Sequence, residues 1–347
     1  MRLTHRQVTR GFMLAMIAVA CAHCGSTKGA VRGGSDAGDT DAQGAAADGG
    51  DIGTDPEAST GPEGDASVVD SGGDATSAGT GSDTCATATV IPLVGKNPRV
   101  DLAATTSGAA HDVDAPCTAD QGPDTFYKFT VSKPVFVYAD TFGATWNTVL
   151  FLLSDTCQPL TTTMTGGAVC SDDSCGTSQS QIVARLEPGS YRLGLGGRGG
   201  ASGDAVIHFE WAIAGSGTTT QLPPTDSVQM GTTTGEGNLS TLSNDCVAAA
   251  GENSYWWARC PSDPARTIHA STCTGTSFES VVEMQVPKLA PGIESAYRCN
   301  IDGCGGGSLQ GALGTNLPAG AGLGVLSVDG QSGNDFGPYS MTVTYTP

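Results

Sequence analysis

The chain has 347 residues, of which 50 are glycine, and only 15% of its side chains are charged. Acidic residues outnumber basic ones by 35 to 16. This balance excludes a nucleic-acid partner, because affinity for phosphate backbones depends on lysine and arginine. A composition so rich in glycine also predicts that part of the chain does not fold.

Residues 1–21 have the pattern of a secretory signal peptide. Three arginines and a histidine precede the apolar run 11–20, which is shorter than the roughly 20 residues of a membrane-spanning helix. The run ends in Ala18-Val19-Ala20-Cys21, which resembles the bacterial lipobox. The resemblance implies that Cys21 is lipidated and anchors an exported lipoprotein to the cell envelope, at the outer membrane or cell surface. Ordinary signal-peptidase cleavage is the alternative.

Residues 22–83 are predicted to be a disordered acidic linker. They consist mainly of Gly, Ala, Asp, Ser and Thr, and between Ser26 and Thr84 acidic residues outnumber basic ones by twelve to two. Such a segment buries too little apolar surface to offset the entropy of ordering its chain. We therefore interpret it as a tether that is kept extended by repulsion among its acidic residues.

The rest of the chain contains an internal repeat. Three pairs of cysteines are each 129 residues apart, namely Cys117 with Cys246, Cys170 with Cys299, and Cys175 with Cys304. The sequence around these cysteines also repeats, as in the Cys-x₄-Cys loops 170–175 and 299–304. The repeat predicts a duplicated domain at residues 84–214 and 226–347, with an inter-domain linker at 215–225.

Both copies consist of short β-branched or aromatic segments separated by Gly, Pro, Asp and Ser, which are strand signals at the spacing of a β-sandwich. No window shows a convincing helical period. In the first copy the predicted strands are 126–131, 135–139, 149–153, 182–186, 191–195 and 205–211. In the second copy they are 255–258, 266–270, 281–286, 309–313, 323–328 and 339–345. The predicted fold is all-β, with two tandem jelly-roll-like antiparallel β-sandwiches.

The first copy resembles the pre-peptidase C-terminal (PPC) domain, a small β-sandwich of secreted bacterial proteins. The resemblance rests on Pro123-Asp124-Thr125-Phe126-Tyr127-Lys128-Phe129, on 139–143 with 147–150, on Cys170-Ser171-Asp172-Asp173, and on Pro188-Gly189-Ser190-Tyr191. It implies a non-catalytic accessory module whose relatives bind collagen or polysaccharide. No peptidase domain accompanies the two copies, which favours a free-standing surface protein.

Ten cysteines follow residue 84, five in each copy, and an export signal favours disulfides between them. The candidates are Cys85, Cys117, Cys157, Cys170, Cys175, Cys246, Cys260, Cys273, Cys299 and Cys304. An odd number per copy leaves either one free thiol in each copy or a bridge between the copies. We expect bridges within each copy. A zinc site is disfavoured because no histidine pair completes a tetrahedral set.

Two further groups of residues are candidates for ligand contact. Asp172, Asp173 and Asp302 lie in turns, where carboxylates usually cap backbone amides, and they are weak candidates for Ca²⁺. No other cofactor or metal is expected. Trp256 and Trp257 are adjacent in a predicted strand, so alternation sends one of them away from the core. That tryptophan either faces a ligand or is covered by the other domain.

No nucleophile, base and orienting group occur at a recognisable spacing, and the Gly-x-Gly-x-x-Gly at 194–199 is followed by a strand instead of the helix that nucleotide binding needs. The sequence therefore predicts a surface-anchored, non-catalytic binding or adhesion module for a polysaccharide or protein, with the membrane as a partner through the lipid anchor. The alternatives are a structural spacer without a specific ligand and a hydrolase with an unfamiliar site.

Overall fold

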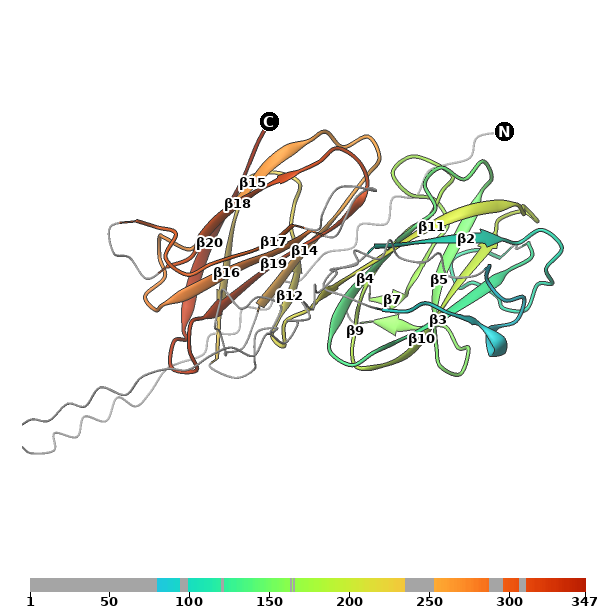
Figure 1. Ribbon diagram of the computed structural model, residues 1–347, viewed down its shortest axis with the longest axis horizontal. Helices are drawn as coiled ribbons and strands as arrows, with labels where there is room; N and C mark the ends of the chain where they lie inside the picture. Colours follow the sequence, from blue (N-terminus) through green and yellow to red (C-terminus); the bar gives the residue numbers. More distant parts are fainter. Residues whose placement is uncertain are drawn as a thin grey trace, which may run out of the picture. The chain divides into compact units, whose positions relative to one another are not determined.

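A computed structural model describes residues 80–93, 99–119, 122–162, 164, 166–234, 253–286, 296–305 and 310–347. The predicted signal peptide, Cys21, nearly all of the predicted tether and Cys246 lie outside these residues. The described chain is all β apart from one short 3-10 turn, η1 (Cys85–Thr87). Its strands form two β-sandwiches (Figure 1).

The first sandwich is built from a five-stranded and a four-stranded sheet. The five-stranded sheet contains, in spatial order, β1 (Thr89–Val90), β3 (Thr125–Val131), β10 (Gly189–Gly197), β5 (Thr148–Ser154) and β8 (Cys170–Ser171). The four-stranded sheet contains β2 (Arg99–Thr105), β11 (Asp204–Ile213), β4 (Val135–Asp140) and β9 (Gln181–Leu186). A small hairpin of β6 (Thr161–Thr162) and β7 (Gly167–Ala168) stands beside them.

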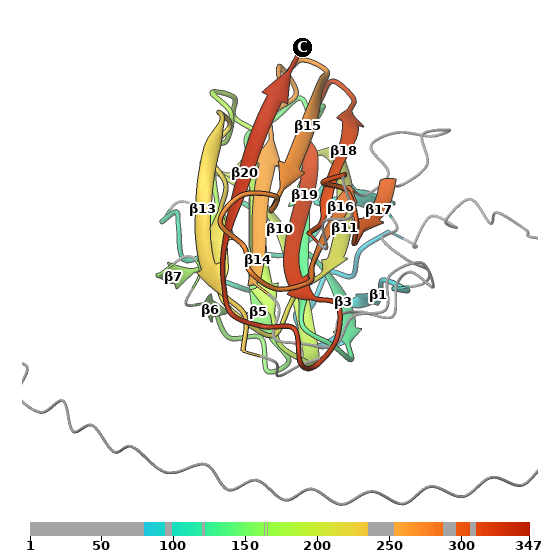
Figure 2. The ribbon, with the colours of Figure 1, turned by 90° about the vertical axis from the view of Figure 1, so that its left-hand side faces the viewer.

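The second sandwich, whose strands face the viewer in Figure 2, repeats this plan. Its five-stranded sheet contains β12 (Thr219–Gln221), β14 (Asn253–Arg259), β19 (Gly322–Gly330), β16 (Ser280–Val286) and β17 (Ala296–Asn300). Its four-stranded sheet contains β13 (Ser227–Thr232), β20 (Pro338–Thr346), β15 (Arg266–Ser271) and β18 (Ala312–Leu317).

Corresponding strands occupy corresponding places in the two sandwiches. In both, the first strand of the five-stranded sheet pairs in parallel with its neighbour, β1 with β3 and β12 with β14. The remaining pairs are antiparallel, for example β10 with β5 and β19 with β16. The two halves of the described chain thus share one topology.

Alternating side chains build each core. In β2 every second residue, Val100, Leu102 and Ala104, is buried, as expected of a strand with one face on a core. Aromatic residues fill much of the first core, where the rings of Phe129 and Phe209 lie 5.1 Å apart. Burying side chains of this size contributes roughly 1.5–3 kcal/mol each, which is how so glycine-rich a chain holds its sheets together.

The structure corrects several predicted elements. A strand was predicted at 309–313, but β18 begins only at Ala312. The edge strands β2, β13 and β17 were not predicted. In β13 the apolar residues Val228 and Met230 point outward. Because the alternating apolar residues are exposed and not buried, the pattern expected of a core strand is missing.

The expected domain boundaries also differ locally from the observed pairing. The segment 215–225, predicted as a linker, contains β12, which pairs with β14 of the second sandwich. Ser82, near the end of the predicted tether, exchanges backbone hydrogen bonds with Phe126 at 2.8 and 3.1 Å. Both boundary segments therefore add a strand or a bridge to the edge of a five-stranded sheet.

The two sandwiches, predicted as two domains joined by a linker, share a buried cluster. Phe136, Tyr138 and Ala212 on the outer face of the first four-stranded sheet cluster with Leu323 and Val325 of β19. Two hydrogen bonds join the Gln285 side-chain amide to the backbone N–H and C=O of Ile213, at 2.9 and 3.2 Å. The Gln181 side chain donates to the Arg259 carbonyl at 2.8 Å. We call this contact the junction.

Candidate functional site

The disulfides follow a different plan from the one expected. Three bridges stay within one sandwich, namely Cys85–Cys157, Cys117–Cys170 and Cys273–Cys304. The fourth, Cys175–Cys260, joins the two sandwiches, so the expectation of bridges only within each copy is wrong. Cys299 is also disulfide-bonded. These bridges indicate an oxidising compartment.

Cys175, which bridges to the second sandwich, has an unusual backbone conformation. Its φ of 57° places it in the left-handed region, at a tight turn that follows β8. Its partner Cys260 directly follows β14, next to Arg259, whose carbonyl accepts the Gln181 hydrogen bond of the junction. The bridge and the junction therefore reinforce each other.

The three weak Ca²⁺ candidates are not gathered into a site. Arg198 Nη1 lies 2.6 Å from a carboxylate oxygen of Asp172 and 3.5 Å from one of Asp173. Asp302 is exposed in a separate turn of the second sandwich. Over the described residues, no three His, Cys, Asp or Glu side chains are grouped in a way that could hold a metal.

The tryptophan pair divides between core and junction. Trp257 is buried in the second core, with 5% of its surface exposed. Trp256, on the opposite face of β14, is partly buried and packs on the cluster that the two sandwiches share. The sequence left two possibilities for the outward tryptophan, a ligand contact or cover by the other domain. Trp256 is covered in part by the other sandwich.

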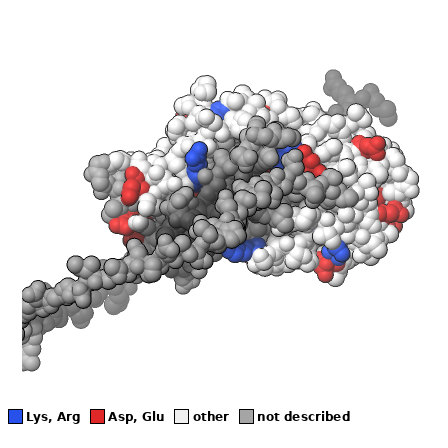
Figure 3. Space-filling model, viewed as in Figure 1, with Lys and Arg blue, Asp and Glu red and all other residues white. Residues whose placement is uncertain are grey.

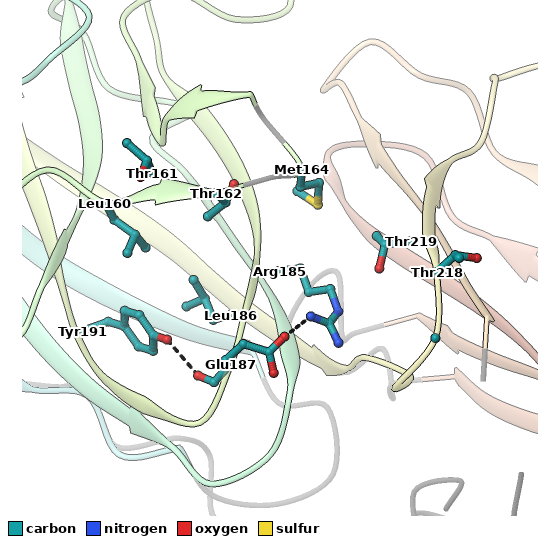
Figure 4. Close-up of a pocket in the computed structure, with 11 residues that line it drawn as sticks. Leu160, Thr161, Thr162, Met164, Arg185, Leu186, Glu187, Tyr191, Thr218 and Thr219 are labelled. Carbon is teal, nitrogen blue, oxygen red and sulfur yellow. Dashed lines mark hydrogen bonds and ion pairs between the residues drawn. The ribbon is translucent and has the colours of Figure 1, made fainter. Parts of the chain in front are cut away.

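A cleft of about 570 Å³ lies beside the first sandwich, at the start of the segment that leads to the second. We call it the linker cleft. Its walls come from the β6–β7 hairpin, the end of β9, the start of β10 and the connecting segment (Figure 4). Its lining residues are Leu160, Thr161, Thr162, Met164, Arg185, Leu186, Glu187, Tyr191, Gly217, Thr218 and Thr219.

The alternation of side chains along β9 places Arg185 on the wall of this cleft. Ile182, Ala184 and Leu186 point into the core, so Arg185 points outward. Its guanidinium forms an ion pair with Glu187 and donates to the Gly215 carbonyl at 2.9 Å. The cation is thus held in place, with its carboxylate partner exposed beside it.

Tyr191 supplies the aromatic wall. Its ring stacks on Phe129 of the core, with centroids 5.9 Å apart and planes at 30°, and its hydroxyl donates to the Glu187 carbonyl at 2.8 Å. Burial, and then the charge of Glu187, raise the pKa of this phenol, so it remains a neutral donor at physiological pH. The ring is fixed before any ligand arrives.

The opposite wall belongs to a segment fastened to the second sandwich. Thr218 donates from both its backbone N–H and its hydroxyl to Asn253 Oδ1 of β14, at 2.9 and 2.7 Å. Thr219 begins β12. The width of the linker cleft therefore depends on the junction, since the two walls are tied to different sandwiches.

This arrangement suits recognition of a polar ligand. A fixed aromatic ring, a guanidinium, a carboxylate and several hydroxyls converge on a space of the size typical of ligand sites. On the face shown in Figure 3, the charged side chains of the described residues are few and scattered. In the linker cleft Arg185 and Glu187 neutralise one another, so a ligand bound by hydrogen bonds and apolar contact fits it better than a highly charged one.

Two of the three described histidines, His208 and His111, pair with carboxylates, whereas His269 is exposed on β15. His208 Nδ1 lies 2.8 Å from Asp140, whose other oxygen accepts a 2.6 Å hydrogen bond from Tyr138. His111 lies 3.0 Å from Asp114 and 3.6 Å from Asp124. No hydrogen bond among the described residues joins a histidine to a serine, threonine or cysteine.

Glu210 is the most deeply buried carboxyl group at the junction. Burial raises its pKa to about 8, although Leu323 N–H donates to its Oε2 at 3.1 Å and Arg99 lies 3.7 Å from its Oε1. Glu210 alternates with buried Phe209 and Trp211 in β11, and from sequence alone it reads as a solvent-facing residue. The second sandwich covers it.

Sequence reasoning did not identify the linker cleft as a site. Pro188-Gly189-Ser190-Tyr191 entered only as part of the PPC resemblance, without a ligand role. A usable signal was present, because Arg185 is the one charged residue of β9 and lies on the face that alternation directs away from the core.

No family model matches the chain, and no curated protein matches it. Among solved structures, one match is a chain of Sulfolobus Turreted Icosahedral Virus. The match covers 64% of this chain and 56% of the viral chain, with 12% identity and a TM-score of 0.22. A triple jelly-roll chain of an archaeal virus matches 64% over 55%, with 10% identity and a TM-score of 0.23. The CUB1-EGF-CUB2 domains of rat MASP-1 match 74% over 99%, with 9% identity and a TM-score of 0.18. Similarity at this level assigns neither family nor function.

Among the described residues, no helix is long and apolar enough to cross a membrane.

Proposed function

We propose that the chain is an exported, non-catalytic binding module that holds an envelope or extracellular polymer, polysaccharide or protein, in the linker cleft. The observation that carries the proposal is the convergence of the fixed Tyr191 ring, the Arg185–Glu187 pair and threonine hydroxyls on one space of about 570 Å³. The resemblance to PPC domains, which accompany secreted enzymes as binding accessories, agrees with it. Lipidation at Cys21 is the proposed means of display.

Multivalency would compensate for a modest single site. One aromatic contact contributes only about 1–2 kcal/mol through apolar burial and stacking. Many anchored copies on one cell surface make each further contact effectively intramolecular. A polymer with repeated units is the kind of ligand that exploits this.

A rigid spacer is the second candidate, and a separate observation favours it. The Cys175–Cys260 bridge and the buried junction hydrogen bonds fix one sandwich on the other. Rigid connection is what a spacer needs, whereas a binding module also needs an accessible site.

The experiment uses the full chain with Cys21→Ser, which removes the predicted anchor, on arrays of glycans and matrix proteins. Thr161→Trp fills the cleft from an exposed position without touching a core, and Thr342→Trp, exposed on β20, is the matched control. Binding that Thr161→Trp abolishes and Thr342→Trp retains supports the proposal. If the chain binds nothing on any array, the binding proposal is wrong and the spacer is the function that is left. Release of product from peptide, ester or glycan substrates overturns the non-catalytic assignment.

A further inference from the structure

The edge strand β13 is an uncharged free edge. Among the described strands it pairs on one side only, with β20, and Figure 2 shows it at the border of its sheet. Its sequence, Ser-Val-Gln-Met-Gly-Thr, contains no charged residue and no proline. Edge strands of monomeric proteins usually carry such residues, because an open edge is a template for another strand.

The hydrogen-bond pattern shows which backbone groups are open. Thr233 N–H donates to the Gly337 carbonyl at 3.0 Å, which extends the β13–β20 ladder by one pair. In an antiparallel ladder hydrogen-bonded and non-hydrogen-bonded pairs alternate. Residues at odd positions therefore bond toward β20, and Val228 and Met230 direct their N–H and C=O groups to the free edge.

The same two residues expose apolar side chains. Val228 is 62% exposed and Met230 83%, on the outer face of the sheet. The corresponding edge of the first sandwich, β2, is built differently, because Arg99 and Asp101 form an ion pair of 2.8 Å there. One edge is thus protected by charge, and the other is not.

We propose that β13 pairs antiparallel with β13 of a second copy of this chain, about a twofold axis at Gln229. In this register Val228 of each copy stands opposite Met230 of the other, so the open backbone groups bond in pairs and the exposed apolar side chains cover one another. Gln229 meets its own counterpart across the axis.

A second copy fits this edge because the strand is self-complementary and uncharged. The chain carries a net charge of −19, yet the contact brings no two carboxylates together, since Asp226 would stand opposite Thr232. The opposite edge of the same sheet, β18, is also uncharged, but its exposed residues are Gly314 and Asn316. Of the two described edges of this sheet, β13 is therefore the one with exposed apolar side chains, and a twofold contact between two copies of β13 closes on itself as a dimer. This inference does not depend on the linker cleft.

The first test is the mass of the full chain with Cys21→Ser by sedimentation equilibrium. We expect a dimer, and we expect Met230→Lys to raise its dissociation constant by about tenfold or more, because the substitution places a charge in both symmetric pairs. Val206→Lys, at a 44% exposed valine on a central strand, is the control and should leave the mass unchanged. Circular dichroism verifies that each variant is folded.

The second test fixes the register. On mild oxidation Gln229→Cys should form a covalent dimer, whereas Thr232→Cys should not, because position 232 lies opposite 226. A wild-type monomer at concentrations on the order of 100 µM overturns the proposal, as does a dimer that Met230→Lys leaves intact. Cross-linking at 232 in preference to 229 overturns it too. Loss of ligand binding in Thr161→Trp with the dimer intact affects the proposed function alone.

Discussion

Replacing Glu210 by glutamine should change how stability depends on pH. In the folded protein burial raises the pKa of this carboxyl group to about 8, against a reference value of 4.5. Between these values the folded state keeps a proton that the unfolded state has released. The folded protein therefore binds more protons than the unfolded chain, and stability must fall as pH rises.

The magnitude follows from the two pKa values. A difference of about 3.5 pKa units at roughly 1.36 kcal/mol each corresponds to about 5 kcal/mol. This stabilisation is fully present below pH 4.5 and is lost as pH rises to about 8. Glutamine resembles the protonated glutamic acid in shape, keeps an acceptor for Leu323 N–H and does not titrate, so Glu210→Gln should not show this loss.

Urea unfolding followed by tryptophan fluorescence at pH 5 and pH 9 is the assay, with equal m-values required for comparison. We expect similar stability of wild type and Glu210→Gln at pH 5, and an advantage of several kcal/mol for the variant at pH 9, up to about 5 kcal/mol. Glu187→Gln, whose side chain is 63% exposed, is the matched control and should follow the wild type. A wild type and a Glu210→Gln variant that lose stability in parallel would refute the reasoning.

Three further predictions concern bridges, packing and export. Replacing both Cys175 and Cys260 by serine should lower the unfolding free energy by about 4 kcal/mol in urea unfolding, because the bridge closes a long loop of sequence separation 85. Trp257→Ala should cost about 3–5 kcal/mol in the same assay through a core cavity, and Trp256→Ala less, since Trp256 lies partly exposed at the junction. Labelling with a palmitate analogue should mark the wild type and not Cys21→Ser, and equal labelling would contradict lipidation.

The central strands were largely predictable, because they are short apolar runs buried on one face, as in β20, or on both faces, as in β4 and β16. Alternation in segments such as 182–186 and 339–345 located β9 and β20. The disulfide plan was not predictable from the same regularity. Cys175 and Cys304 are equivalent by the repeat, yet both bond to cysteines of the second copy, Cys260 and Cys273. Pairing depends on where the turns of two different sandwiches meet, and spacing carries no information about that.

The linker cleft was beyond sequence reasoning for a related reason. Its walls come from 160–162 with Met164, from 185–187 with Tyr191, and from 217–219. In the sequence each of these segments looks like an ordinary turn, strand end or linker. No single segment contains a motif, because the chemistry arises only when the three converge. Glu210 illustrates the same limit, since periodicity identifies the outer face of β11 but not the sandwich that covers it.

A comparison of equivalent positions in the two sandwiches shows how contact with the second sandwich changes the environment of Glu210. Tyr138 is the fourth residue of β4 and pairs with Glu210, while His269 is the fourth residue of β15 and pairs with Thr344. The first pair is buried at the junction, whereas His269 is exposed and Thr344 only partly buried. The topology is the same, so the raised pKa of Glu210 comes from docking and not from the sandwich itself. Any change that separates the sandwiches should return this pKa toward its ordinary value, and the pH dependence of stability then measures whether the junction is closed.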